Sequence, residues 1–116
     1  MVDPWITSDV QTMLAKSKHQ DATLAALIYA IKLMRQAQIE PTELQLVILT
    51  NHLAEMVDRS ITGAALADVD PEMFAGVSPE ALQIADAVVA HIGNLADSEK
   101  YVASIHFETA KNNLKI

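Results

Sequence analysis

The sequence predicts an all-α protein that folds as a compact bundle of five to six helices. Hydrophobic residues make up 51% of the 116-residue chain and aromatic residues only 4%, so we expect a core built mainly from Ala, Leu, Ile, Val and Met. Ala and Leu also have high helix propensity. Three glycines and four prolines are too few for a turn-rich β protein. Capping residues and prolines precede the apolar segments, and glycines follow them, as is typical of helices.

The first two helices are predicted from their N-terminal signals. Ser8 and Gln11 have the spacing of a capping box, which predicts a helix over about residues 9–18. Asp21 is a suitable N-cap for a second helix over about residues 23–38, where apolar residues recur at helical spacing.

The third helix is predicted to be the central one. Pro41 breaks the chain, and Thr42 with Gln45 forms a second capping box, so the helix runs from there to about residue 61. Its apolar residues extend around nearly the whole circumference, which predicts that it is covered on several sides. These residues are Leu44, Leu46, Val47, Ile48 and Leu49.

One Asp-Pro pair and one Ser-Pro pair mark the starts of later helices. Asp70-Pro71 predicts a short helix near 71–75, and Ser78-Pro79 predicts a longer one at 79–92. A last helix is expected from about residue 98 to 113. All three glycines, Gly63, Gly76 and Gly93, fall just past the end of a predicted helix, where a left-handed residue is wanted.

Charge and composition exclude several classes of function. The formal net charge is −7 and the eight Lys and Arg residues are scattered, so we expect neither direct nucleic-acid binding nor a basic membrane-surface helix. The sequence has no cysteine, no signal peptide at its start, and no apolar run near the roughly 20 residues that span a bilayer. We therefore expect a cytoplasmic protein with a single domain over residues 1–116.

Signatures of catalysis or of a cofactor are absent from the sequence. There is no glycine-rich phosphate loop and no glycine-flanked serine of a nucleophile elbow. His52 and Glu55 have the spacing of a helical metal-ligand pair, but a lone pair of this kind often arises by chance. We therefore expect no metal, no cofactor and no enzymatic activity.

Two of the four histidines interrupt apolar helix faces. His52 lies in the third predicted helix and His106 in the last one. Each has a charged residue seven positions away on the same face, Arg59 after His52 and Glu99 before His106. Seven residues correspond to about 10 Å of helical rise, too far for direct contact. A group that orients either imidazole is therefore expected from across the bundle.

From spacing alone, a structural role is the more common explanation of these histidines. A single histidine on an apolar face is commonly a half-buried core residue whose ring nitrogens are satisfied by neighbours. His19, near a helix junction, is expected at the solvated surface. His91, in the last turn of the fifth helix, is a favourable residue for the helix dipole.

The segments around His52 and His106 resemble a known family. Residues 49–59 read LTNHLAEMVDR, which resembles the first histidine motif of the PRD, the regulation domain of the bacterial sugar phosphotransferase system. That motif ends in an acidic residue and an Arg, as Asp58 and Arg59 do here. Residues 99–107 read EKYVASIHF and resemble the second motif, in which a Glu precedes an apolar run ending in His and a large apolar residue. The predicted helix order also matches, so the resemblance covers about residues 8–113.

The resemblance implies a regulatory function. It implies that His52 and His106 are phosphoryl acceptors, and that the supporting charges are Asp58, Arg59 and Glu99. The phosphocarrier protein of the phosphotransferase system is the implied donor, and a transcriptional or metabolic partner is the implied target. Members of the family pair through these domains, so we expect a homodimer. The chain is thus expected to be a stand-alone, single-domain member.

Two other functions remain open at this stage. One is a non-catalytic interaction or dimerisation module with the same fold, whose histidines are structural. The other is a small enzyme or metal-binding bundle that uses His52, Glu55 and His106. A phosphoryl acceptor must present a ring nitrogen to solvent, whereas a packing histidine can bury both.

Overall fold

A computed structural model describes residues 3–64 and 66–112 and confirms the all-α class. Its elements are α1 (Ser8–Ala15), α2 (Gln20–Gln36), α3 (Glu43–Thr62), the 3₁₀ helix η1 (Pro71–Phe74), α4 (Pro79–Ile92) and α5 (Ser98–Lys111). The expectation of five to six helices is therefore confirmed.

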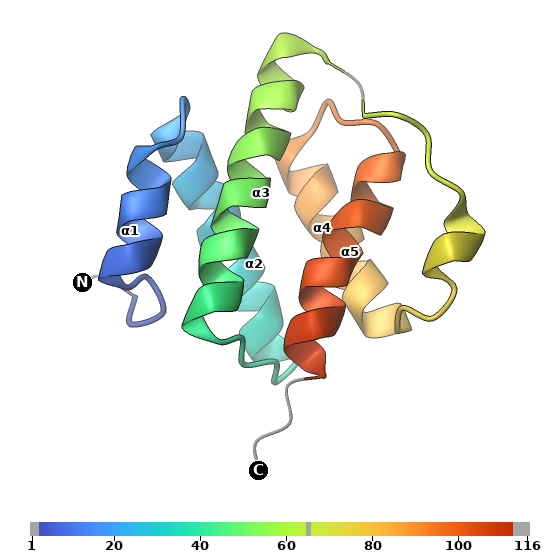
Figure 1. The fold of residues 1–116 in the computed structure, drawn as a ribbon, viewed down its shortest axis with the longest axis horizontal. Coiled ribbons are helices and arrows are strands. Elements are labelled where there is room, and N and C mark those ends of the chain that lie inside the picture. Colours follow the sequence, from blue (N-terminus) through green and yellow to red (C-terminus); the bar gives the residue numbers. More distant parts are fainter. Residues whose placement is uncertain (1–2, 65, 113–116) are drawn as a thin grey trace.

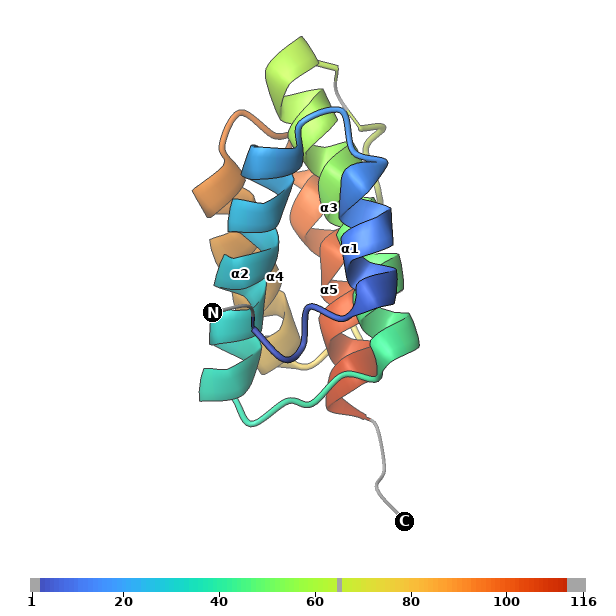
Figure 2. The ribbon, with the colours of Figure 1, turned by 90° about the vertical axis from the view of Figure 1, so that its left-hand side faces the viewer.

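The five α-helices form two layers. α1, α3 and α5 lie side by side in one layer, with α3 in the middle (Figure 1). α2 and α4 form the second layer behind them (Figure 2). Two layers of helices account for a flat molecule of 37 × 36 × 19 Å. The same arrangement brings the middle of α3 against α5, which is where both histidine segments lie.

The helix starts follow the predicted signals in part. Thr42 and Gln45 form the predicted capping box of α3, in which each side chain accepts a hydrogen bond from the other residue's backbone N–H. The predicted Ser8 box is wrong: Thr7 caps α1, and the Gln11 side chain donates to the carbonyl of Ile6 instead. Capping one residue earlier lets the helix begin at Ser8.

The start of α2 also lies earlier than expected. His19, not Asp21, is the N-cap residue, and its side chain makes no capping hydrogen bond. The Thr23 hydroxyl donates to the His19 carbonyl and contacts the Ser17 hydroxyl, so these two small polar side chains organise the junction. Asp21 lies inside the first turn, where a negative charge favours the helix dipole.

The three glycines behave differently from one another. Gly63 ends α3 with φ 79° and ψ 7°, the predicted left-handed conformation. Gly93 ends α4 with φ 79° but ψ 165°, so its φ is positive without being left-handed helical. Gly76 has no positive φ, and the prediction there is wrong. The expected end of the last helix at residue 113 lies outside the described residues.

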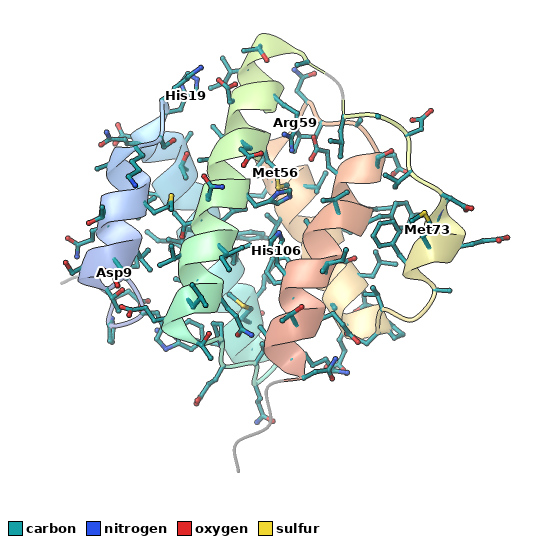
Figure 3. The ribbon with its side chains drawn as sticks, in the orientation of Figure 1. Asp9, His19, Met56, Arg59, Met73 and His106 are labelled. Carbon is teal, nitrogen blue, oxygen red and sulfur yellow. The ribbon has the colours of Figure 1, made fainter. Side chains whose placement is uncertain are left out.

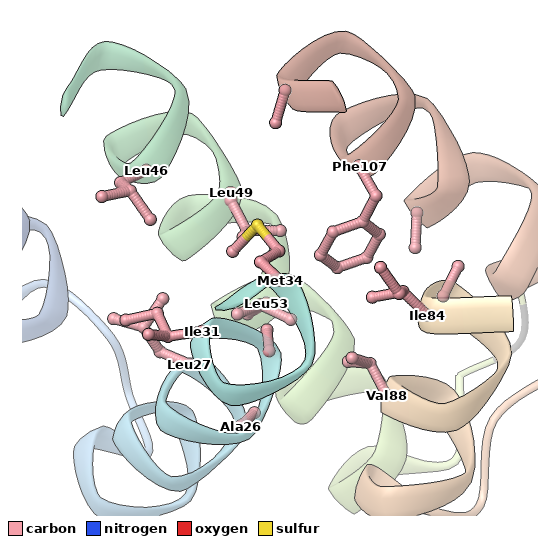
Figure 4. Close-up of a cluster of buried hydrophobic side chains, with 14 of the residues drawn as sticks. Ala26, Leu27, Ile31, Met34, Leu46, Leu49, Leu53, Ile84, Val88 and Phe107 are labelled. Carbon is pink, nitrogen blue, oxygen red and sulfur yellow. The ribbon is translucent and has the colours of Figure 1, made fainter. Parts of the chain in front are cut away.

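The core has the composition that the sequence predicts. Phe107 of α5 is its largest buried side chain, and aliphatic side chains surround it (Figure 4). The neighbours come from α2, α3 and α4, and include Met34, Leu53, Ile84 and Val88. Burial of one large apolar side chain contributes roughly 1.5–3 kcal/mol, so this cluster is a substantial source of stability.

α3 is central but not fully covered. Leu46, Leu49 and Leu53 are buried, whereas Leu44 is 67% and Ile48 48% exposed. The prediction of a central helix covered on several sides is confirmed, because α3 has neighbours behind and beside it, and its exposed apolar residues lie where no helix covers it in front (Figure 1).

Candidate functional site

The two candidate histidines face each other between α3 and α5. The ring centroids of His52 and His106 lie 4.8 Å apart, and the ring planes are tilted by 38°. Figure 3 shows the imidazole of His106 in the space between the two helices. Each ring is half-buried. We predicted that each imidazole has a neighbouring group from another helix. Each of the two histidines is that neighbour for the other.

The surroundings of these rings favour their neutral forms. Burial above all, together with the positive charges of a protonated His106 and of Arg59, lowers the pKa of His52 to about 4. Burial also lowers the pKa of His106, although the carboxylate of Glu55 opposes this. At neutral pH both imidazoles are therefore uncharged, and each has one nitrogen with a free lone pair.

The two nitrogens of His52 have different environments. Nε2 is buried and has no hydrogen-bond partner among the described residues. A buried polar atom without a partner is uncommon and calls for a physical reason. Since Nε2 is enclosed, a reaction of this ring with an external group takes place at the other nitrogen.

An ion pair joins the same two helices, about two turns along each helix from its histidine. Arg59 of α3 donates from Nε to Glu99 Oε2 at 2.6 Å and from Nη2 to Glu99 Oε1 at 2.8 Å. The Glu99 side chain is fully buried and that of Arg59 is 18% exposed. The carboxylate raises the pKa of Arg59. The sequence places each charge on the face of its own histidine, but spacing alone does not indicate that the two charges pair.

Two more hydrogen bonds hold the same end of α3. The Ser60 hydroxyl donates to the Gly93 carbonyl at 2.6 Å, and the Asn94 side chain donates to the Ser60 carbonyl at 2.7 Å. With the Arg59–Glu99 pair they form what we call the α3–α5 clasp. Small polar residues around a glycine at a helix end are the only sequence signal of this contact.

Other charges near the histidines point elsewhere. Asp58 lies 3.4 Å from Nε2 of His19, so it faces α1 and α2 rather than the histidine pair. His19 is half-buried, which corrects its expected place at the solvated surface. Glu55 is bound by the Asn51 amide at 3.1 Å and lies 4.0 Å from Arg59.

His91 makes a contact that the sequence did not predict. It lies in the last turn of α4, as expected, and is exposed, but its ring stacks on Tyr29 of α2 at 4.3 Å with a 9° angle between the planes. It is far from the histidine pair in the fold, because α2 and α4 form the other layer.

The described residues contain neither a metal cluster nor a membrane span. No three His, Asp or Glu side chains of residues 3–64 and 66–112 converge as metal ligands. Within the same ranges, no helix combines the length and the apolar character needed to cross a bilayer.

The fold and the site define a small all-α domain with a facing histidine pair. Comparison with solved structures gives its family. The chain is similar to a PRD-containing transcription regulator from Lactobacillus casei ATCC 334, with 47% sequence identity, a TM-score of 0.90, and coverage of 98% of this chain and 100% of that chain. The chain therefore belongs to the PRD family, which confirms the resemblance, and it is a PRD-type regulatory domain. No protein-family model and no protein of curated function matches the sequence.

Proposed function

We propose that the chain is a regulatory domain that is reversibly phosphorylated on His52, His106 or both by the phosphocarrier of the sugar phosphotransferase system. The observation that carries this proposal is the pair of neutral, half-buried imidazoles facing each other 4.8 Å apart between α3 and α5. Arg59 and Glu99 hold the neighbouring helix ends, and Asp58 contributes to the field around Arg59.

The chemistry suits a neutral imidazole. Its lone pair attacks the phosphorus of the carrier's phosphohistidine and forms a new N–P bond. The N–P bond of the carrier breaks, and the carrier's imidazole leaves with the electron pair and takes up a proton to become neutral. The acceptor ring loses the proton of its other nitrogen, so the charges balance. Positioning and stabilisation of charge dominate such a transfer. This chain is the acceptor and needs neither a cofactor nor a catalytic activity of its own.

The product changes the charge of the α3–α5 face. A phosphoryl group adds close to two negative charges, and the chain already has a net charge of −7. Such a change repels an acidic neighbour or recruits an arginine, and so alters docking to a partner. The partner we propose is a component of transcriptional or metabolic control in the cytoplasm, where the carrier operates.

A homodimer is part of the same proposal. Four large apolar side chains on the helices that carry the histidines are exposed: Leu44 by 67%, Ile48 by 48%, Ile61 by 57% and Ile105 by 46%. A second copy that covers them would place each histidine pair close to the subunit interface, where added charge changes the affinity.

An interaction module with structural histidines is the second candidate. The buried Nε2 of His52 favours it, because one side of that ring is closed to an external phosphoryl donor. The two candidates differ in one measurable respect, which is the formation of an acid-labile adduct.

The test is intact-mass analysis after incubation with phosphoenolpyruvate, the first enzyme of the phosphotransferase system and its phosphocarrier. An acid-labile adduct that is lost in His52→Gln or His106→Gln, but kept in His91→Gln, supports phosphorylation at the facing pair. His91→Gln is the matched control because His91 is an exposed histidine in the other layer. No adduct, with a phosphorylated carrier present, favours the interaction module.

A further inference from the structure

Glu99 is a fully buried carboxylate whose charge is balanced from another helix. Both of its oxygens accept from Arg59, and its side chain is 0% exposed. Removing the partner of a buried charge is strongly unfavourable, because the isolated charge is then neither paired nor solvated. The conformation around the start of α5 therefore depends on where the Arg59 guanidinium lies.

Arg59 is also placed to meet an anion on His52. The two residues are seven positions apart on α3, so they share a face of the helix. The charge of Arg59 already acts on the His52 ring. The helical rise between them is about 10 Å, so the two side chains do not meet directly, and an extended arginine together with a phosphoryl group on His52 is needed to span it.

We propose that a phosphoryl group on His52 takes Arg59 from Glu99 and thereby releases the α3–α5 clasp. This inference rests on the proposed function, since it requires phosphorylation at His52. A phosphoryl group offers three acceptor oxygens and close to two charges, so it competes with a single carboxylate for the guanidinium. Glu99 then turns toward water, and the start of α5 moves away from Ser60 and the end of α3.

The chain provides an internal control for this exchange of partners. It has two arginines, and each makes a two-point ion pair: Arg59 with Glu99, and Arg35 with Asp3 at 2.6 Å for both contacts. Arg35 lies on α2, in the layer that lacks the histidine pair. Arg59 donates through Nε and Nη2, and Arg35 donates through Nη1 and Nη2. Nuclear magnetic resonance of the guanidinium N–H groups of both arginines therefore reports a switched and an unswitched pair in one sample.

The experiment uses potassium phosphoramidate, which transfers its phosphoryl group to imidazole nitrogen and releases ammonia. Because it needs no carrier protein, the inference is tested even if the carrier fails to phosphorylate the chain. Tandem mass spectrometry identifies the modified histidines. The expected result is a shift of the Arg59 Nε–H signal and faster amide exchange around Gly93 and Glu99, with the Arg35 signal unchanged.

Two variants make the result decisive. His52→Gln, treated in the same way and still modified at other histidines, should keep the Arg59 signal in place. Glu99→Gln, which preserves shape without the charge, should show little further increase in amide exchange after phosphorylation. The inference is overturned if Arg59 moves no more than Arg35, if His52→Gln shows the same shift, or if phosphoramidate modifies other histidines and never His52.

Discussion

His52 and His106 lie with their ring centroids 4.8 Å apart, each from a different helix and each with a lowered pKa. At this distance the protonation of one ring disfavours that of the other, and both rings also lose solvation. The fold therefore holds two neutral imidazoles side by side at neutral pH. The neutral ring nitrogens can act as nucleophiles. The same arrangement makes the stability of the fold decrease at acidic pH.

We expect the free energy of unfolding to decrease as the pH falls from 7 to 5. In the unfolded chain a histidine takes up a proton near pH 6.5, whereas the folded state keeps His52 neutral down to about pH 4. The unfolded state thus binds more protons across this window and is favoured by about 2 kcal/mol from His52 alone. His106 acts in the same direction. Urea unfolding at both pH values measures the change.

The matched control for this effect is His52→Gln, which cannot titrate. Its unfolding free energy should fall by about 2 kcal/mol less over the same interval. The lowered pKa values of Asp3 and Glu108 remove stability only at more acidic pH, below the ordinary range of carboxyl groups. An identical pH dependence in the variant and the parent would contradict the assignment to His52.

We also expect His52→Gln and His106→Gln to be stable at pH 7, within ~1 kcal/mol of the parent. Among residues 3–64 and 66–112, Nε2 of His52 is buried without a hydrogen-bond partner, so replacing this ring breaks no hydrogen bond at that atom. Thermal and chemical denaturation measure this. If both variants instead lose several kcal/mol, the histidines are structural, and the interaction module is the better account of the fold.

Much of the fold could be predicted from the sequence, because helix starts and ends have local chemical causes. The Thr42–Gln45 box and the Pro79 start of α4 were predicted and are observed. Thr7 was missed as a cap because its neighbour Ser8 is equally suitable by residue type. His19 was missed because Asp21, two residues later, is the more suitable residue type.

The candidate site was only partly predictable for a different reason. Periodicity places His52 and Arg59 on one face of a helix, and it says nothing of which helix lies opposite. The pairing of Arg59 with Glu99 and the turn of Asp58 toward His19 arise from tertiary packing across 40 and 39 residues of sequence. The exposure of Leu44 also follows from the layer arrangement rather than from the helix itself.

The Arg59–Glu99 pair should show strong coupling in a double-mutant cycle. Arg59→Met leaves the carboxylate of Glu99 buried and alone, which costs roughly 3–5 kcal/mol. Glu99→Leu should cost less, since Arg59 is partly exposed and can turn toward water. The double variant should recover most of the loss, because both charges are gone. Additive losses in urea unfolding would mean that the two residues act independently.

The caps of α1 and α3 provide a comparison of neighbouring residues. Thr42→Ala removes one half of the capping box and should cost about 1 kcal/mol. Thr7→Ala should cost up to that amount, since its hydrogen bond to the Val10 N–H is longer, at 3.4 Å. Ser8→Ala should be nearly neutral because Ser8 is exposed and lies inside the helix. A larger loss for Ser8→Ala than for Thr7→Ala would reinstate the capping box that the sequence predicted.

Phe107 tests whether the core at the layer interface determines stability. Phe107→Ala removes the largest fully buried side chain and should cost about 3–5 kcal/mol, because the lost contacts leave a cavity among residues from α2, α3 and α4. Ile105→Ala, two residues earlier on α5 and 46% exposed, should cost less than about 1 kcal/mol in the monomer. If the protein is a dimer through this face, however, Ile105→Ala should weaken association in analytical ultracentrifugation while leaving the monomer folded. A large loss of monomer stability for Ile105→Ala would contradict its placement on the exposed face of α5.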